Sequence, residues 1–288
     1  MVSSLSGKLC VVTGANSGVG KATTRLLAEQ GARVAMVCRN ERRGERARRE
    51  IVRRTDNSGV SLLIADLSSL AEVRRLAATL VGQLDRLDLL VNNAGVYRAR
   101  REISADGFEM TMAVNHLAHF LLTHLMLDHL RAAEGQVVNV SSQAHHSAKL
   151  SRMPLEGIIR GEGGYRGLRA YSDSKLANVL FTFELARWLG AGSDVTTNAL
   201  HPGVLATRIW SQNLNLPSLT MRVFKPFLGR PRRGGKAIVR LAVEPGLRGI
   251  TGRYFDQLKE SRASEAARDT TLAARLWELS NRLTGSPA

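Results

Sequence analysis

Short apolar runs alternate with longer amphipathic stretches along most of this chain of 288 residues. The apolar runs are continuous, which is typical of strands buried on both faces of a parallel sheet. The stretches between them repeat apolar residues three and four positions apart, as in a helix with one buried face. The pattern predicts strands over residues 9–12, 32–38, 60–65, 87–91, 136–140 and 195–200, and helices over 18–30, 41–54, 70–84, 105–133 and 171–189.

The alternation of strand and helix predicts an α/β fold, a doubly wound parallel sheet of about seven strands with helices on both faces. With 44% hydrophobic residues the chain can bury a large core, and we expect a single domain over residues 1–288. Residues 144–168 and 207–233 interrupt the alternation and are interpreted as insertions around a site. The second stretch is rich in apolar residues and indicates a substrate lid, with ordinary packing as the alternative.

Composition narrows the cellular setting. No apolar run approaches the ~20 residues of a membrane span, and the first eight residues lack the apolar core of a signal peptide, so we expect a cytoplasmic protein. Cys10 and Cys38 lie inside predicted strands without metal-like spacing and are expected to be core residues. Four histidines on the predicted long helix have no carboxylate or cysteine at ligand spacing, so no metal site is expected; they are His116, His119, His124 and His129.

The formal net charge of +16 would ordinarily suggest a nucleic acid or an anionic surface as partner. Much of the charge is local, because residues 39–54 hold eight arginines interleaved with glutamates, the pattern of a solvated helix face. No aromatic interleaving or zinc module accompanies them, so we expect no specific nucleic-acid partner. Basic residues between 222 and 233 leave open a weak peripheral contact with an anionic membrane.

Tyr171 and Lys175 are the first candidate for chemistry. Their spacing of four places both side chains on one face of a helix, one turn apart. A tyrosine titrates near pKa ~10, and an adjacent ammonium can supply much of the fall of about 3 units that a phenolate needs near neutral pH. Tyr165, followed by Arg169, competes but is placed less well between strand and helix. A solvated pair without chemistry is the alternative.

A glycine-rich segment joins the first predicted strand to the first helix. Gly14 permits a tight turn, Gly18 lets the backbone approach a pyrophosphate, and Gly20 allows close helix packing. The helix amino terminus favours the anion. The segment therefore predicts a dinucleotide-binding turn, with a ligand-free structural turn as the alternative; the residues expected to contact the cofactor are Gly14, Asn16, Ser17, Gly18, Val19 and Gly20.

The end of the second strand bears on the choice of cofactor. A carboxylate there would bind the ribose hydroxyls of NAD and repel a 2′-phosphate, but the position holds Cys38. Arg39 can bind a 2′-phosphate, unless it simply begins the basic helix. We therefore predict NADP(H) over NAD(H). Asp66 and Leu67, at the end of the third strand, are expected near the adenine, with a helix cap near Ser68 as the competing interpretation of Asp66.

Taken together, these motifs resemble the short-chain dehydrogenase/reductase family over residues 8–285. Segments 138–145, 171–178, 200–204 and 275–280 resemble its retinol dehydrogenase-like branch. The resemblance implies an NADP-linked oxidoreductase of alcohols or aldehydes. It is carried by Thr13 to Gly20, Asn92 to Gly95, Asn115, Ser142, Tyr171 with Lys175, and Pro202 with Gly203.

The resemblance also implies roles for these residues. Tyr171 would be the general acid in reduction and the base in oxidation. Lys175 would lower the pKa of Tyr171 and hold the nicotinamide ribose. Ser142 would donate a hydrogen bond to the substrate oxygen, and Asn115 would position a water that relays protons to Lys175. The hydride chemistry belongs to the nicotinamide.

Loops after two further strands complete the expected cofactor site. Asn93, Ala94 and Gly95 would border the adenosine ribose, while Asn92 is expected to be structural. The peptide around Val204 would lie by the nicotinamide carboxamide and Thr207 near the phosphates, following Pro202 and Gly203. Plain loops are the alternative. His145 and His146 follow Ser142 and either border the substrate or are ordinary polar loop residues.

The sequence thus predicts an NADP(H)-dependent oxidoreductase acting on an apolar alcohol, aldehyde or ketone. The alternative is a catalytically silent NADP-binding scaffold or redox sensor on the same fold. The resemblance further implies a homo-oligomer assembled through the helices at 105–133 and 170–189.

Overall fold

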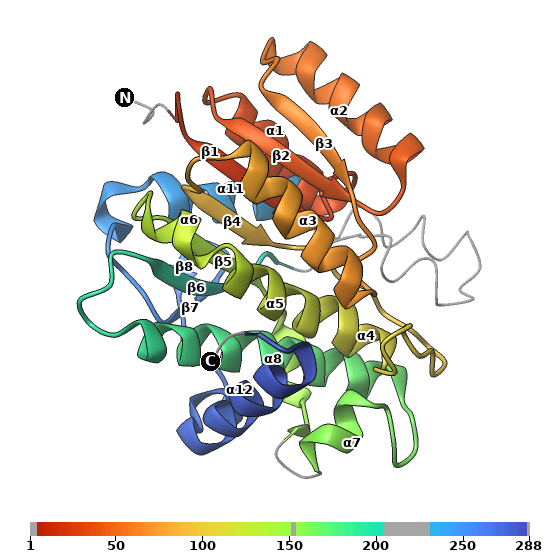
Figure 1. Cartoon of the computed structure of the whole chain (residues 1–288). Helices are drawn as coiled ribbons and strands as arrows, with labels where there is room; N and C mark the ends of the chain where they lie inside the picture. Colours follow the sequence, from red (N-terminus) through yellow and green to blue (C-terminus); the bar gives the residue numbers. More distant parts are fainter. Residues whose placement is uncertain (1–4, 151–153, 204–230, 287–288) are drawn as a thin grey trace, which may run out of the picture.

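One sheet of eight strands organises the molecule. The computed structural model describes residues 5–150, 154–203 and 231–286 (Figure 1). The strand order is β3-β2-β1-β4-β5-β6-β7-β8, and all neighbours are parallel except β7 and β8. The predicted doubly wound α/β fold is confirmed, with one strand more than expected. The strands are β1 (Leu9–Thr13), β2 (Arg33–Cys38), β3 (Val60–Ile64), β4 (Leu89–Asn92), β5 (Gln136–Val140), β6 (Thr196–His201), β7 (Arg253–Asp256) and β8 (Lys259–Glu260).

Helices cover both faces of the sheet because successive strand residues point to opposite sides. Val12 of β1 packs in a buried cluster with residues of α1 and α11, whereas its neighbour Val11 packs in a cluster with α3 and α5. The helices are α1 (Gly18–Ala28), α2 (Glu41–Thr55), α3 (Leu70–Gln83), α4 (Met110–Met112), α5 (Ala118–Leu125), α6 (Leu127–Arg131), α7 (Leu155–Ile159), α8 (Gly167–Leu189), α11 (Pro231–Val243) and α12 (Thr270–Thr284).

The predicted long helix over 105–133 is wrong in its bounds and in its continuity. The side chain of Glu109 caps α4 by accepting from the Met112 amide at 2.9 Å, so the helical segment begins only at Met110. A π-helical turn, Ala113–Leu117, separates α4 from α5, and Met126 departs from helical geometry between α5 and α6. The prediction for α8 began four residues late. Two strands and two helices beyond residue 201 were not located from the sequence: β7, β8, α11 and α12.

Helices α1 and α11 pack closely, and this contact fixes the start of α1 and the segment after β6. A Cβ atom on Gly235 of α11 would lie 2.9 Å from the backbone nitrogen of Thr23 in α1. A Cβ on Gly234 would lie 2.9 Å from the Cβ of Pro202 and 3.2 Å from Cγ2 of Val19. Glycine at both positions therefore holds the segment after β6 against the start of α1.

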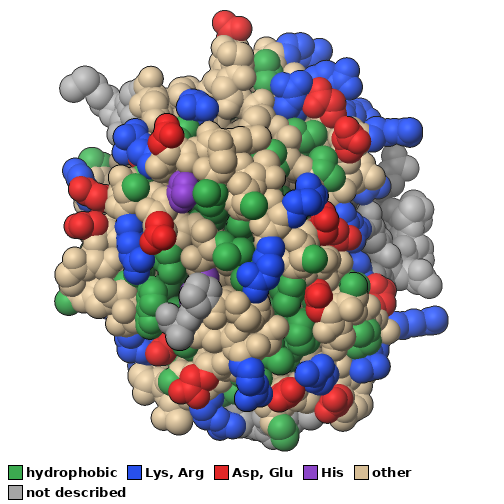
Figure 2. Space-filling model, viewed as in Figure 1, with side chains coloured by type: hydrophobic (Ala, Val, Ile, Leu, Met, Phe, Trp, Pro, Cys, Tyr) green, Lys and Arg blue, Asp and Glu red, His purple; other side chains and the backbone are tan. Residues whose placement is uncertain are grey.

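The basic helix α2 is paired within itself and with its neighbour. Glu45 contacts Arg48 at 2.8 Å and Arg49 at 3.4 Å, and Glu50 contacts Lys21 of α1 at 2.7 Å. On the face shown in Figure 2, basic and acidic side chains are interspersed. This is the solvated helix face expected from the sequence. Within the described ranges, no helix combines the length and the apolarity that crossing a bilayer requires.

Candidate active site

The glycine-rich loop lies between β1 and α1, and its geometry demands glycine at two points. Gly14 has φ +65°, and a Cβ there would lie 2.9 Å from the Cα of Ala94. A Cβ on Gly20 would lie 2.5 Å from both the side-chain nitrogen of Asn93 and the carbonyl oxygen of Gly14. Ser17 precedes α1 in an extended conformation, and its side chain does not cap the helix. The loop thus brings bare backbone to the edge of the sheet, as a pyrophosphate site needs.

Cys38 supports this loop from the neighbouring strand. Backbone amides of Ala15 and Asn16 hydrogen-bond to its thiol, while burial raises the pKa of the thiol to about 11. The thiol is therefore an uncharged packing group at neutral pH. Cys10 is likewise a buried free cysteine, as the sequence led us to expect.

Thr13 connects the glycine-rich loop to the turn after β4. Its hydroxyl oxygen accepts hydrogen bonds from the backbone amides of Asn93 and Ala94, both at 2.9 Å. The side-chain amide of Asn93 donates in turn to the Thr13 carbonyl at 2.7 Å. Asn92 instead bonds inside the core, to Thr123 at 2.9 Å and to the side chain of Asn139 at 2.8 Å. Asn93 therefore braces the loop, and Asn92 ties the sheet to α5.

His119 connects this hydrogen-bond network to Asn115. Its Nδ1 lies 3.1 Å from the Asn115 carbonyl oxygen, which can only accept, so Nδ1 carries the proton. Burial lowers the pKa of His119 to about 4, so the ring is neutral and Nε2 accepts from the Thr13 hydroxyl at 2.9 Å. Sequence reasoning considered His119 only as a metal ligand and missed this link. The spacing of the four histidines gave no signal for it.

Asn115 lies in the π-helical turn, a feature frequently found at functional sites. Its side-chain amide donates to the Val96 carbonyl at 3.1 Å and to the Ser174 hydroxyl at 3.0 Å, while its oxygen accepts from the Val96 amide at 2.8 Å. A Cβ on Gly95 would lie 3.5 Å from that oxygen and 3.6 Å from Nζ of Lys175. The turn after β4 therefore lies directly beside Asn115 and Lys175.

Tyr171, Ser142 and Lys175 lie together, as predicted. Ser142 follows β5, and its side chain forms a hydrogen bond that favours the Tyr171 phenolate. Lys175 lies one turn after Tyr171 on α8, with Nζ 5.7 Å from the tyrosine ring centroid, and it donates to the Val140 carbonyl at 2.9 Å. Both Tyr171 and Lys175 are almost fully buried. A proton donor, a hydroxyl and an amine thus converge at one end of β5.

The expected fall in the pKa of Tyr171 is absent from this structure. Burial raises the pKa of Tyr171 to about 12, because it outweighs the effect of the Ser142 hydrogen bond. Burial also lowers the pKa of Lys175 to about 8. Both groups are therefore drawn toward their neutral forms, and the sequence could not reveal how deeply they lie. The competing tyrosine, Tyr165, bonds to the Arg98 carbonyl at 2.9 Å and to Glu109 at 3.1 Å, away from this cluster.

The ends of β2 and β3 present the residues expected near the adenosine. Arg39 is exposed in the turn before α2, whose cap is Asn40, so Arg39 does not belong to the basic helix. Asp66 accepts from the amide and hydroxyl of Ser68 at 3.0 and 2.8 Å, and the cap of α3 is Ser69 rather than Asp66. Leu67 is buried under α3. These carboxyl-end loops share one edge of the sheet with the glycine-rich loop.

The loop after β6 is described only in part. Pro202 packs against α11, and Gly203 has φ +95° with the Gln257 side chain 3.3 Å from where its Cβ would lie. Val204, Thr207 and most of the predicted lid over 207–233 lie outside the described residues.

His145 supports Ser142 from beneath. Its Nδ1 lies 2.7 Å from the Ser142 carbonyl oxygen and its Nε2 accepts from the Ser264 amide at 3.2 Å. Burial lowers the pKa of His145 to about 4, which keeps the ring neutral. His146 is exposed. Across residues 5–150, 154–203 and 231–286, histidine, cysteine and acidic side chains form no group of three that could hold a metal ion.

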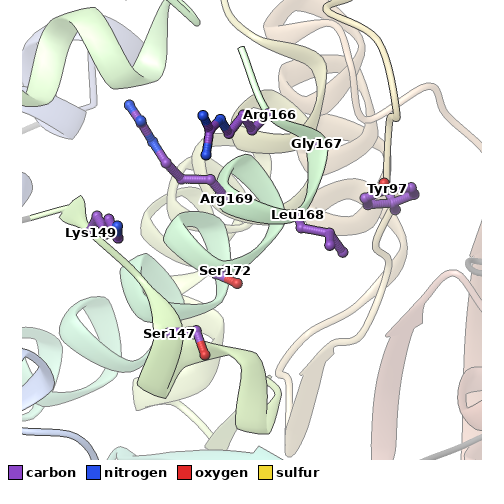
Figure 3. Close-up of a pocket in the computed structure, with 8 residues that line it drawn as sticks. All are labelled: Tyr97, Ser147, Lys149, Arg166, Gly167, Leu168, Arg169 and Ser172. Carbon is purple, nitrogen blue, oxygen red and sulfur yellow. The ribbon is translucent and has the colours of Figure 1, made fainter. Parts of the chain in front are cut away.

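A cleft of about 500 Å³ lies between Tyr97 and the start of α8 (Figure 3). The ring of Tyr97, which lines it, meets the Tyr171 ring edge-on with the centroids 6.3 Å apart. The sequence analysis interpreted residues 144–168 as an insertion around a site. It gave no other indication of which residues form this cleft. They are Tyr97, Ser147, Lys149, Arg166, Gly167, Leu168, Arg169 and Ser172.

Comparison with known proteins agrees with this geometry. Residues 8–153 match the family model described as short chain dehydrogenase. Human retinol dehydrogenase 12 is 43% identical over 98% of this chain and 87% of its own length. The chain therefore belongs to the short chain dehydrogenase family and is an oxidoreductase. Its predicted resemblance to the retinol dehydrogenase-like branch is confirmed, since human retinol dehydrogenase 11 is also 41% identical over 98% of this chain and 87% of its own length.

Solved structures share the fold. An uncharacterized protein from Mycobacterium paratuberculosis superposes with a TM-score of 0.80 at 34% identity, covering 100% of this chain and 97% of that one. The RhlG/NADP active-site complex of Pseudomonas aeruginosa gives 0.69 at 28% identity, covering 88% and 95%. The family and this second neighbour favour a nicotinamide cofactor.

Proposed function

We propose that this protein is an NADP(H)-dependent oxidoreductase that transfers a hydride between the nicotinamide and an apolar alcohol, aldehyde or ketone. The observation that carries the proposal is the cluster of Ser142 with the buried Tyr171 and Lys175 beside the glycine-rich loop. The printed names of the relatives support alcohol or aldehyde chemistry, because they are retinol dehydrogenases.

The described residues fit the cofactor. The glycine-rich loop forms a cradle that a Cβ on Gly14 or Gly20 would fill, and Arg39 is exposed where a 2′-phosphate would lie. NADP(H) would supply the hydride. The residues that would hold it are those predicted from the sequence: Gly14, Asn16, Ser17, Gly18, Val19, Gly20, Arg39, Asp66, Leu67, Asn93, Ala94, Gly95, Tyr171, Lys175, Pro202 and Gly203, with Val204 and Thr207 beyond the described part.

In the proposed mechanism Tyr171 donates a proton to the carbonyl oxygen during reduction. The raised pKa of Tyr171 supports proton donation in the reduction, since the phenol keeps its proton at neutral pH and transfers it to the alkoxide that develops on the substrate. Ser142 would share its hydrogen bond between Tyr171 and the substrate oxygen. Lys175 would hold the nicotinamide ribose, and Asn115, anchored in the π-helical turn, would position the water that returns a proton toward Lys175.

Loss of NADPH absorbance with a panel of aliphatic aldehydes, retinal and ketosteroids tests the proposal. We expect Tyr171→Phe to lower kcat by at least about 10²-fold, the typical contribution of a positioned acid, while NADPH binding persists. Turnover that survives the substitution would reject the mechanism. NADPH binding without turnover of any member of the panel would favour the silent scaffold or redox sensor.

The cofactor preference has its own test. We expect kcat/KM to favour NADPH over NADH, and Arg39→Gln to reduce that preference about tenfold or more through loss of a charge-assisted contact. Arg49→Gln is the matched control, because Arg49 is equally basic but lies on α2 with its side chain 73% exposed. Equal efficiency of the two cofactors in the native protein would contradict the assignment.

Two broader expectations accompany this function. We propose a cytoplasmic protein that forms a homo-oligomer through α5 and α8, the helices that correspond to the segments named from the sequence. Light scattering after size-exclusion chromatography measures the mass in solution. A mass of 31.4 kDa, that of one chain, would contradict the homo-oligomer.

A further inference from the structure

The cleft between Tyr97 and the start of α8 is unusually cationic for a site that would take an apolar substrate. Three of the residues that line it are basic and none is acidic. Lys149 comes from the segment after β5, and Arg166 and Arg169 come from the start of α8. None belongs to the glycine-rich loop or to the turn with Arg39, so this positive charge is separate from the charge expected to hold the cofactor.

One carboxylate contacts two of these three basic residues. Asp173 lies 3.8 Å from Nε of Arg169, and it accepts from the backbone amide of Lys149 at 2.6 Å. Its side chain is only 1% exposed, so it fixes the position of both segments from below. Lys149 and Arg166 are exposed and form no ion pair within the described ranges. The mouth of the cleft therefore keeps a net positive charge.

The opposite side of the cleft is apolar. Leu168 precedes Tyr171 by three residues and so lies one turn earlier on the same side of α8. Leu168 is 59% exposed, so its apolar side chain is open to contact with a substrate. Figure 3 shows Leu168 directed toward Tyr97, with Lys149 and Arg169 on the other side of the helix end. Apolar contact and positive charge thus line the same cleft, together with Tyr97, whose ring contacts the Tyr171 ring.

We propose that the substrate is amphipathic: an apolar chain that carries the reacting carbonyl or alcohol and an anionic group, with Lys149, Arg166 and Arg169 binding the anion. The inference rests on the proposed function and narrows its substrate class. Arg166 precedes Tyr171 by five residues, about 7.5 Å along the helix axis, so several carbons separate the anion from the reacting oxygen. Guanidinium and ammonium groups select carboxylate or phosphate over a neutral chain end.

Matched aldehydes test this preference. NADPH-dependent reduction is measured for ω-oxo fatty acids and for n-alkanals of the same chain length. We expect the native protein to favour the anionic member about tenfold in kcat/KM at low salt, and the preference to shrink as salt is added. Lys149→Gln combined with Arg166→Gln should reduce the preference about fivefold, through a higher KM for the ω-oxo acid, and leave the n-alkanal within about twofold.

Arg248→Gln combined with Arg49→Gln is the charge-matched control, since it also removes two positive charges, from side chains that are 85% and 73% exposed and do not line the cleft. It should leave the preference unchanged. Equal turnover of the two aldehydes, with a ratio that the double variant does not alter, would overturn the proposal.

A binding measurement separates this inference from the proposed function. Titration of decanoate and of decyl phosphate into the protein saturated with NADP⁺ requires no turnover. Binding that weakens at least fivefold in the double variant supports the anionic site even if no aldehyde is reduced, in which case the proposed function fails alone. Tighter binding of decyl phosphate than of decanoate identifies a phosphate as the preferred anion. Failure of both to bind overturns the anionic site.

Discussion

Tyr171 and Lys175 both lie in surroundings that favour their neutral forms, and this predicts how reduction depends on pH. Tyr171, with its pKa raised to about 12, stays protonated across the accessible range. Lys175, with its pKa lowered to about 8 by burial, loses its charge well before a free lysine does. We therefore expect kcat/KM for carbonyl reduction to be level between pH 6 and pH 7.5 and to fall above an apparent pKa of about 8. A kcat/KM profile that stays level to pH 10 would contradict this expectation. The affinity for NADPH, measured over the same pH range, shows whether a decrease in kcat/KM comes from weaker cofactor binding.

His119 offers a second prediction at this scale. His119→Phe removes the acceptor for the Thr13 hydroxyl and the donor to the Asn115 carbonyl, whereas Gln can replace both. We expect the Phe variant to lose about 1–3 kcal/mol in the free energy of unfolding and to bind NADPH more weakly. His119→Gln should recover much of both. Urea unfolding and NADPH titration measure the two effects, and equal behaviour of the two variants would contradict a hydrogen-bonding role.

The sequence predicted the proximity of some site residues but not their burial or their more distant partners. The spacing of Tyr171 and Lys175 predicts that they lie together, because a helix fixes that relation locally. Their pKa values could not be predicted, since burial depends on the packing of the whole site. The role of His119 was hidden because the hydroxyl that it binds belongs to Thr13, 106 positions earlier in the chain.

At the scale of elements, the junction of β1 and α1 is tightly constrained. Gly20→Ala would force a Cβ within 2.5 Å of the Gly14 carbonyl, a backbone atom that cannot move without opening the loop. We expect this variant to lose NADPH binding and to unfold more easily. Gly82→Ala, near the end of α3 with nothing within 4 Å, is the matched control and should be stabilising by about 0.5–1 kcal/mol. Thermal unfolding with and without NADPH distinguishes the two, and retention of NADPH binding in Gly20→Ala would contradict the account.

The elements before residue 201 were largely predictable, because continuous apolar strands and amphipathic helices alternate there. The segment over 105–133 was harder. It is apolar enough to suggest one helix, but the Glu109 cap and the π-helical turn depend on contacts with the segment around Ile159 and with α8. Strand β8 has two residues and both are charged and exposed, so no apolar pattern marks it.

At the scale of the molecule, buried neutral histidines predict acid sensitivity. Burial lowers the pKa to about 3 for His116 and to about 4 for His119 and His145. Below pH 6.5 the unfolded chain binds protons at these rings and the folded chain does not, so stability is complete above pH 6.5 and is lost as the pH falls toward 4. Each ring contributes a slope of up to about 1.4 kcal/mol per pH unit.

Urea unfolding at pH 7, 6 and 5 measures this loss. His145→Gln should reduce the slope, because it removes one of the rings whose pKa burial lowers. A free energy of unfolding that is constant between pH 7 and pH 5 would contradict the prediction. Under the proposal of a single domain, the same experiment should give one cooperative transition rather than two.

The shortest strand of the sheet also has a consequence for how copies of the protein meet. β8 pairs antiparallel with β7 through only two residues, Lys259 and Glu260, and both side chains are charged and exposed. A border this short and this hydrated is a poor template for a strand from another molecule. The β8 edge therefore disfavours strand pairing between molecules, and we expect that crowding in the cell does not lead to fibril nucleation at this edge.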